Sequence, residues 1–146
     1  MMERYYFIVE EALRLELYFS LVAAPAYGAQ AAFVGTVRSP NRGQVVTSID
    51  YQGYEAMMKT QMAVIADELE ANYQLGVFVM AHRLGLLKPG EASIAIVISA
   101  PHRADALAAC QQAIERTKEL LPVWKYETRE EGADWVAGSR KAAEPL

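Results

Sequence analysis

Two lysines on either side of a proline are the residues best suited to chemistry in this sequence. Lys118 and Lys125 stand seven positions apart, with Pro122 between them in the run Leu-Leu-Pro-Val-Trp-Lys. Proline lacks a backbone N–H and disfavours helix at the residue before it, so Pro122 is expected to end a helix that carries Lys118 and to start an extended segment that carries Lys125. The two ammonium groups are therefore expected to meet at a corner.

Lys118 is predicted to lie in the apolar stripe of its helix. At about 100° per residue it falls within roughly 20° of Leu107 and roughly 40° of Ile114 around the helix axis. A lysine there either extends its ammonium to the edge of the core or stands in a partly dry pocket where an anion compensates its charge. Both interpretations are open for Lys118 alone, and the second lysine beside Trp124 favours an anion site.

Further cationic side chains stand where they could hold an anion. His102 and Arg103 begin the predicted third helix, where free N–H groups and the helix dipole favour phosphate, although a solvated surface charge explains this pair equally well. Arg38 ends a predicted strand beside a loop with Arg42, and an arginine there can fork onto a carboxylate or phosphate. Together with the lysines, these residues would suit a phosphate-bearing substrate and an amine that moves protons or attacks a carbonyl.

Other reactive residue types indicate structure rather than chemistry. We interpret His82, at the end of a predicted strand, as a side chain that satisfies backbone groups. Cys110, the single cysteine, falls on the helix stripe and is interpreted as a small buried hydrophobe, not a catalytic thiol. The cysteine and the two histidines are well separated, so neither a metal nor a cofactor is expected. The sequence also lacks a Ser-His-Asp spacing, a Gly-rich phosphate loop and a paired-carboxylate motif.

Length and composition indicate one globular domain over residues 1–146. The chain is 53% hydrophobic and 22% charged, which excludes general disorder. Its net charge of −4 argues against nonspecific nucleic-acid binding, which requires a basic face. The longest apolar run, 92–100, is far shorter than the about 20 residues of a membrane span. Acidic residues interrupt the faintly signal-like amino-terminal segment, so we expect a cytoplasmic chain without a membrane segment.

Hydrophobic periodicity predicts the order helix, strand, strand, helix, strand, strand, helix, strand. The predicted ranges are 10–22, 29–38, 45–54, 55–73, 77–84, 92–99, 103–120 and 123–129. Pro89-Gly90 predicts a tight turn, so the strands before and after it should pair as a hairpin. The inward positions of the second helix are Met58, Met62, Ile65 and Leu69. This order, with a Trp135 segment that returns to pack, is typical of an α+β sandwich with helices on one face of a mixed sheet.

Several motifs occur together in one known family. They are Phe33-Val34-Gly35-Thr36-Val37-Arg38 with Asn41-Arg42-Gly43, the segment from Ile49 to Tyr54, His82-Arg83-Leu84-Gly85 with Pro89-Gly90-Glu91, Pro101-His102-Arg103, and Lys118-x-x-x-Pro122-Val123-Trp124-Lys125. On these motifs the chain resembles the large, catalytic subunit of molybdopterin synthase, over residues 28–138. Two departures, Gln52-Gly53 in place of Glu and Ala and Thr60 in place of a common lysine, concern the nearby helix and loop and not the lysine pair.

The resemblance implies an α/β hammerhead-type fold and a homodimer with a small ubiquitin-like subunit docked at each outer end, a heterotetramer. The small subunit's C-terminal Gly-Gly thiocarboxylate would deliver sulfur to cyclic pyranopterin monophosphate, and two such transfers make the dithiolene of molybdopterin. By position, the resemblance implies that Lys118 and Lys125 are catalytic. It implies that they bind substrate together with Thr36, Val37, Arg38, His102, Arg103, Tyr126 and Glu127.

Two other classes of function are compatible with the same residues. A noncatalytic module of this fold would bind a ubiquitin-like tail or a phosphorylated metabolite without converting it. Such a module would tolerate arginine in place of Lys118, because it uses only the charge. An unrelated Schiff-base lysine enzyme would need a carbonyl substrate and no protein partner. Proton transfer and covalent attack both require an amine whose pKa can fall from its usual value of about 10.4.

Overall fold

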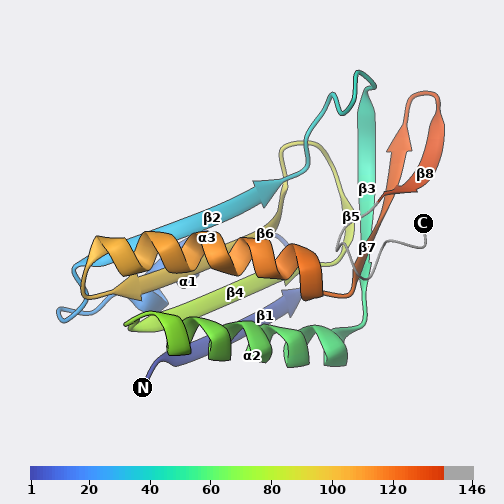
Figure 1. Ribbon diagram of the computed structural model, residues 1–146. Coiled ribbons are helices and arrows are strands. Elements are labelled where there is room, and N and C mark those ends of the chain that lie inside the picture. Colours follow the sequence, from blue (N-terminus) through green and yellow to red (C-terminus); the bar gives the residue numbers. More distant parts are fainter. Residues whose placement is uncertain (137–146) are drawn as a thin grey trace.

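The computed structural model describes residues 1–136, and residues 137–146 of the predicted domain lie outside the described part. Eleven elements form within it, and the strands make two sheets (Figure 1). The first sheet has the order β1 (Glu3–Val9), β4 (Val77–Arg83), β6 (Ala92–Ala100) and β2 (Ala29–Thr36). The second has the order β5 (Gly85–Leu87), β3 (Val46–Gly53), β7 (Val123–Arg129) and β8 (Gly132–Val136). The first sheet is mixed, as predicted, because β1 is parallel to β4 whereas β6 is antiparallel to both its neighbours.

Helices cover both faces of the first sheet. Helices α2 (Glu55–Asn72) and α3 (Arg103–Leu120) pack on one face, and α1 (Leu15–Val22) packs on the other (Figure 1). The central strands are apolar on both sides: Met80 faces the core under α2 and α3, whereas its neighbour Val79 packs with the side chains of α1. The prediction of helices on one face only is therefore wrong, because a strand that is apolar on both sides needs a cover on each.

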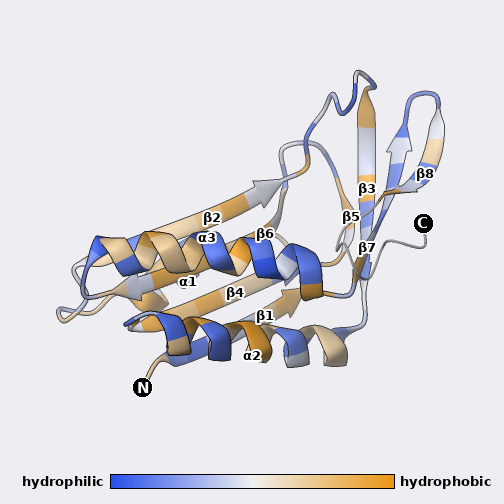
Figure 2. Ribbon diagram, viewed as in Figure 1, coloured by the Kyte–Doolittle hydropathy of each residue, from blue (hydrophilic) through white to orange (hydrophobic). Residues whose placement is uncertain are grey.

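The core between α2 and the first sheet forms from the positions that periodicity predicted. Met58, Met62, Ile65 and Leu69 are completely buried. Figure 2 shows α2 and α3 with mixed polar and apolar segments, as expected of helices that cover a sheet with one side only. The start of α2 at Glu55 and its end at Asn72 agree with the predicted range to within one residue.

The buried face of α3 differs from the predicted stripe. Leu107 is 61% exposed, and Lys118 is exposed as well. The side that meets the sheet carries small residues instead, namely Ala106, Ala109, Cys110, Ala113 and Thr117. Small side chains let a helix lie close to a sheet, so the large leucine was a poor guide to the inward direction. Cys110 is buried as predicted, but Lys118 lies at the rim of the core rather than inside its stripe.

Strand β1 and the separate second sheet were not predicted. The run Tyr5 to Val9 is continuously apolar, and so short a run has no period that separates strand from helix. The hairpin expected around Pro89-Gly90 forms, because β4 and β6 are antiparallel neighbours, and the short β5 leaves their connection to join the second sheet. The Trp135 segment returns as β8 and pairs with β7. In the described part of the chain, no helix is long and apolar enough to cross a membrane.

Candidate active site

The corner at Pro122 forms as predicted. Helix α3 ends at Leu120, Leu121 is extended with φ −73° and ψ 125°, and β7 begins at Val123. The Leu121 N–H donates to the Thr117 carbonyl at 3.0 Å, which closes the last turn of the helix. The corner connects a helix on the first sheet to a strand of the second sheet, so Lys118 and Lys125 come from different parts of the molecule.

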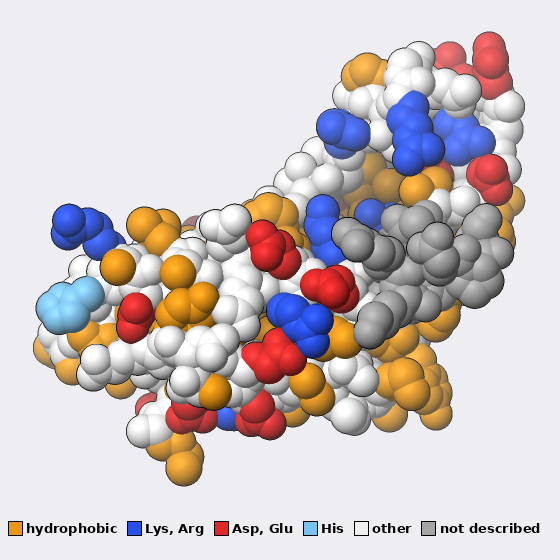
Figure 3. Space-filling model, viewed as in Figure 1, with side chains coloured by type: hydrophobic (Ala, Val, Ile, Leu, Met, Phe, Trp, Pro, Cys, Tyr) orange, Lys and Arg blue, Asp and Glu red, His pale blue; other side chains and the backbone are white. Residues whose placement is uncertain are grey.

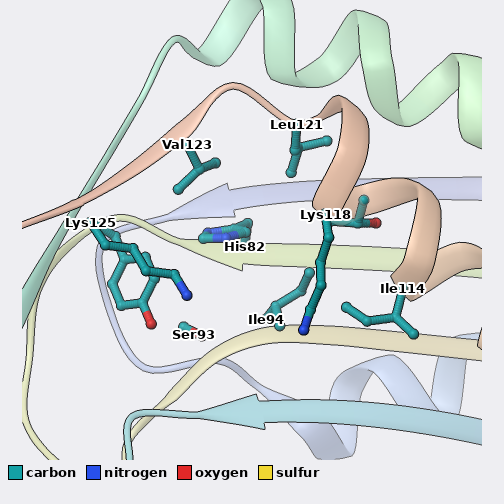
Figure 4. Close-up of a pocket in the computed structure, with 10 residues that line it drawn as sticks. His82, Ser93, Ile94, Ile114, Lys118, Leu121, Val123 and Lys125 are labelled. Carbon is teal, nitrogen blue, oxygen red and sulfur yellow. The ribbon is translucent and has the colours of Figure 1, made fainter. Parts of the chain in front are cut away.

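Lys118 and Lys125 point into one cleft. Figure 4 shows Lys118 reaching from the end of α3 and Lys125 from β7, with both ammonium groups near Ser93 and Ile94 of β6. The cleft has a volume of about 510 Å³, and both lysines also line an adjoining hollow of about 80 Å³. A cleft of this size can hold a small-molecule substrate. Figure 3 shows lysine and arginine side chains gathered around the hollow where the second sheet rises from the first.

Four other predicted residues line the same cleft, namely Thr36, Val37, Arg38 and Glu127. An Arg38 Nη2–H donates to Asn41 Oδ1 at 2.8 Å, and the Asn41 amide donates to Glu127 Oε1 at 3.2 Å. Glu127 is only 4% exposed, and its second carboxylate oxygen accepts from Arg129 at 3.0 Å. This network orients Arg38 with one of its five N–H donors. The guanidinium therefore keeps donors with which it can bind an anion.

Tyr126 lies outside this cleft. It stands between Lys125 and Glu127 on β7, and successive side chains of a strand point to opposite faces. The Tyr126 ring packs on Trp135 instead, with ring centroids 5.0 Å apart. The structure therefore does not bring Tyr126 to the lysines, contrary to the role that the resemblance implied.

His102 and Arg103 are also far from the lysines of their own chain. Both are exposed at the start of α3, whereas Lys118 lies in its last turn. At 1.5 Å per residue, the fifteen helical steps from Arg103 to Lys118 span about 22 Å. The cluster of Arg38, His102, Arg103 and the two lysines therefore does not form within one chain.

The surroundings of Lys125 make its amine easier to deprotonate. Burial lowers the pKa of Lys125, the positive charge of Lys118 lowers it further, and Glu127 acts in the opposite sense. A lysine with a lowered pKa can transfer a proton or attack a carbonyl closer to neutral pH. The sequence did not reveal which lysine is affected in this way, because the burial of Lys125 depends on the packing of the two sheets.

Two residues of the pocket wall, His82 and Tyr51, were missed as site residues. His82 is 6% exposed and its Nδ1 lies 3.0 Å from the Arg83 carbonyl, which confirms that it satisfies a backbone group. Its ring nevertheless lines the hollow beside the lysines. Burial lowers the pKa of His82 to about 4, the Lys125 charge contributes, and the bond to Arg83 opposes the shift. Tyr51 lies opposite Lys125 in the pair β3 and β7, and its place in the site could be predicted only with knowledge of the strand register.

Nothing in residues 1–136 brings three metal-ligating side chains of the His, Cys, Asp and Glu types together. The cleft instead offers cationic donors from three elements, Lys118 of α3, Lys125 of β7 and Arg38 after β2. Such an arrangement can bind anionic groups, stabilise a developing negative charge and move a proton through a lysine amine.

Comparison with solved structures gives close matches. The crystal structure of molybdopterin synthase from Staphylococcus aureus matches with a TM-score of 0.84 and 34% identity, over 89% of this chain and 95% of that one. A complex of subunits 1 and 2 of molybdopterin-converting factor from Helicobacter pylori matches with a TM-score of 0.75 and 27% identity, over 90% and 89% of the two chains. These similarities confirm the α+β class.

Comparison with the sequences of known proteins agrees with the structural matches. The molybdopterin synthase catalytic subunit of Staphylococcus carnosus is 35% identical over 133 residues, which cover 91% of this chain and 89% of that protein. The catalytic subunit of Bacillus subtilis is 38% identical over 109 residues, 75% of this chain and 69% of that protein. The model of the family described as MoaE protein matches residues 8–120. The motifs around Lys118 and Lys125, the fold and these matches agree, and the chain belongs to the MoaE protein family.

Proposed function

We propose that this chain is the catalytic subunit of a molybdopterin synthase. It converts cyclic pyranopterin monophosphate to molybdopterin with sulfur from the thiocarboxylated C-terminus of a small ubiquitin-like subunit. The observation that carries the proposal is the convergence of Lys118 and Lys125, from two different elements, on one cleft that also contains Arg38. A thiocarboxylate tail and a phosphate are both anions, so both are matched by these three cations.

The cleft residues take separate roles in the proposed reaction. Arg38 binds the substrate phosphate, because its guanidinium is held by Asn41 and keeps further donors. The sulfur of the tail first bonds to a substrate carbon while a C–O bond at that carbon breaks. Water then adds to the terminal carbonyl carbon of the tail, and negative charge develops on the carbonyl oxygen. The bond between this carbon and sulfur breaks, so the sulfur stays on the substrate and the tail becomes a carboxylate. Lys125, whose pKa is lowered by burial, removes a proton from the attacking water, and Lys118 stabilises the charge on the carbonyl oxygen and gives it a proton.

We further propose that two copies of the chain share their sites, which would reconcile the distant His102 and Arg103 with a role in substrate binding. The midpoint between Arg103 and Lys118 on α3 falls beside Gln111, which is exposed. If two α3 helices pack antiparallel about this point, the start of each helix meets the end of the other. The exposed Leu107 supports such a contact, because it leaves an apolar side chain on the outer face of α3.

The proposed function requires the partner subunit. The purified chain with the pyranopterin should form no dithiolene product, and product should appear when a small subunit ending in thiocarboxylated Gly-Gly is added. Mass spectrometry of the pterin measures the outcome. The control is the same subunit with an ordinary carboxylate, which carries no sulfur. Product formed without any small subunit would contradict the proposal.

Cys110→Ala should keep turnover within about threefold of the wild type, because a buried thiol on the sheet side of α3 acts as packing. Burial also raises the pKa of Cys110, which keeps the thiol protonated and poorly nucleophilic. Initial rates with the complete system measure the effect, and thermal unfolding confirms that the variant folds. A folded Cys110→Ala variant with no activity would show that this cysteine carries the sulfur.

A further inference from the structure

Three side chains from three different strands form a contact series at the wall of the cleft. Lys125 Nζ of β7 lies 5.8 Å from the centre of the Tyr51 ring of β3. The Tyr51 ring meets the ring of His82 of β4 edge to face, with centroids 5.7 Å apart and an interplanar angle of 64°. His82 Nδ1 in turn lies 3.0 Å from the Arg83 carbonyl. Figure 4 shows His82 behind the space into which the two lysines point.

The first contact of this series follows from strand register. Tyr51 and Lys125 are directly opposite each other in the antiparallel pair β3 and β7, and such neighbours share a face of the sheet. The separation of 5.8 Å between the ammonium and the ring centre is within the range of a cation–π contact. Tyr51 is 5% exposed, so this contact is largely removed from water and stronger than a surface contact of the same kind.

The second contact depends on the state of His82. A carbonyl oxygen only accepts hydrogen bonds, so the proton of the neutral ring is on Nδ1, where it is donated to Arg83. Burial holds the pKa of His82 at about 4, and the ring is therefore uncharged at neutral pH. A charged imidazolium beside Lys125 and Lys118 would repel both ammonium groups. His82 thus fills the wall without adding a third positive charge.

We propose that Tyr51 and His82 are positioning residues for Lys125, in an inference that rests on the proposed function. The face of the Tyr51 ring holds the ammonium so that it points toward the same space as Lys118. The His82 ring, fixed by its bond to the Arg83 carbonyl, keeps the Tyr51 ring in place from the other side. Neither residue needs to touch the substrate for this role.

The ring of Tyr51 also affects the titration of Lys125. Among the described residues, the groups that face this amine are Lys118 from α3, Tyr51 from β3, His82 from β4 and Glu127 on β7 itself, and Arg38 lies further along the cleft. Burial and Lys118 disfavour the ammonium, whereas Glu127 and the face of the Tyr51 ring favour it. Loss of the ring should therefore lower the pKa of Lys125 further.

Tyr51→Leu tests this role directly, because it removes the ring, and Tyr51→Phe keeps the ring but loses the hydroxyl. The chain contains only five lysines, Lys59, Lys88, Lys118, Lys125 and Lys141, so NMR titration of ¹³C-labelled lysine side chains can follow Lys125 once Lys125→Arg assigns its signal. We expect the pKa of Lys125 to fall by about 0.4 to 1.5 pH units in Tyr51→Leu and to stay near the wild-type value in Tyr51→Phe. Tyr54→Leu, at an exposed aromatic of the same segment, is the matched control and should cause no shift.

His82 is tested in the same titration. His82→Ala leaves a hollow behind the Tyr51 ring and should shift Lys125 in the same direction as Tyr51→Leu, whereas His82→Phe fills the space with an uncharged ring and should restore the wild-type titration. Thermal unfolding of each variant establishes that it folds. If Lys125 titrates identically in the folded wild type, Tyr51→Leu and His82→Ala, the positioning role is wrong.

A kinetic measurement separates this inference from the proposed function. In the complete reaction, Tyr51→Leu should lower kcat by about ten- to a hundredfold, as expected for a displaced reacting group, and leave the KM for the small subunit unchanged. A rise in that KM with kcat unchanged would contradict the positioning role. Absence of turnover in the wild type would instead refute the proposed function, and the lysine titration would still decide on Tyr51 and His82.

Discussion

Lys118→Arg should lose almost as much turnover as Lys118→Ala, about 10²–10³ in kcat, when the small subunit and the pyranopterin are both present. The guanidinium keeps the positive charge, but it neither loses a proton near neutral pH nor attacks a carbonyl carbon. Its planar fork also places its donors differently from the compact ammonium that reaches into the cleft from the end of α3. Lys118 is exposed, so both variants should fold.

Single-turnover rates with saturating subunit measure this effect. Lys59→Arg is a suitable control, because Lys59 is exposed on α2. Lys141 is a less suitable choice, because it lies outside the described residues. Near-normal turnover of Lys118→Arg would show that position 118 supplies only charge. That result would make Lys118 an electrostatic anchor and refute its part in proton transfer.

A dimer assembled from one Lys118→Ala chain and one Arg103→Ala chain, assayed with substrate below its KM, should recover activity that each variant alone has largely lost. If sites are shared through antiparallel α3 helices, one site of this mixed dimer lacks both side chains and the other is intact. Random assembly makes half of the dimers mixed, and each has one working site of two, so we expect about a quarter of the wild-type rate. Co-expression of the two variants, followed by the complete assay, measures the recovery.

Arg38→Ala provides the control for this experiment. Arg38 and Lys118 line the same cleft of one chain, so mixing Arg38→Ala with Lys118→Ala should create no intact site and no recovery. By calorimetry, Arg38→Ala and Arg103→Ala should each weaken binding of the phosphate-bearing substrate by about 1.5–3 kcal/mol, with little change in binding of the small subunit. Recovery with Arg38→Ala, or equal substrate affinity for the wild type and both variants, would refute the shared site.

The parts of the fold that the sequence predicted well are those with local causes. The ranges of α3 and β7 agree with the predicted ones, because Pro122 separates them and the helical period is long enough to read. Strand β1 depends instead on its pairing with β4, in which Glu3 lies beside Val77, 74 positions later in the chain. The division into two sheets likewise depends on contacts between distant segments, which hydrophobic periodicity does not contain.

The site residues likewise divide into those placed by local sequence and those placed by contacts between distant segments. The corner that brings Lys118 and Lys125 together is local, whereas the places of Tyr51 and His82 require the strand register and the packing of two sheets. The buried face of α3 was predicted wrongly from Leu107, because small residues rather than large ones face the core there. The sequence alone could have ruled out Tyr126 as a residue of the cleft. In a strand, Lys125 and Glu127 point to one face of the sheet, and Tyr126 between them points to the other.

The corner at Pro122 has a consequence for the molecule as a whole. Lys118 belongs to a helix packed on the first sheet, and Lys125 belongs to the second sheet, so an anion held by both amines is a noncovalent crosslink between the two halves. A bound ligand stabilises the conformation to which it binds, and here that conformation includes the relative orientation of the two sheets. Amide hydrogens of β3 and β7 should consequently exchange more slowly when the cleft is occupied, even at positions that no ligand touches. A ligand in the cleft is thus also expected to stabilise the contact between the two sheets.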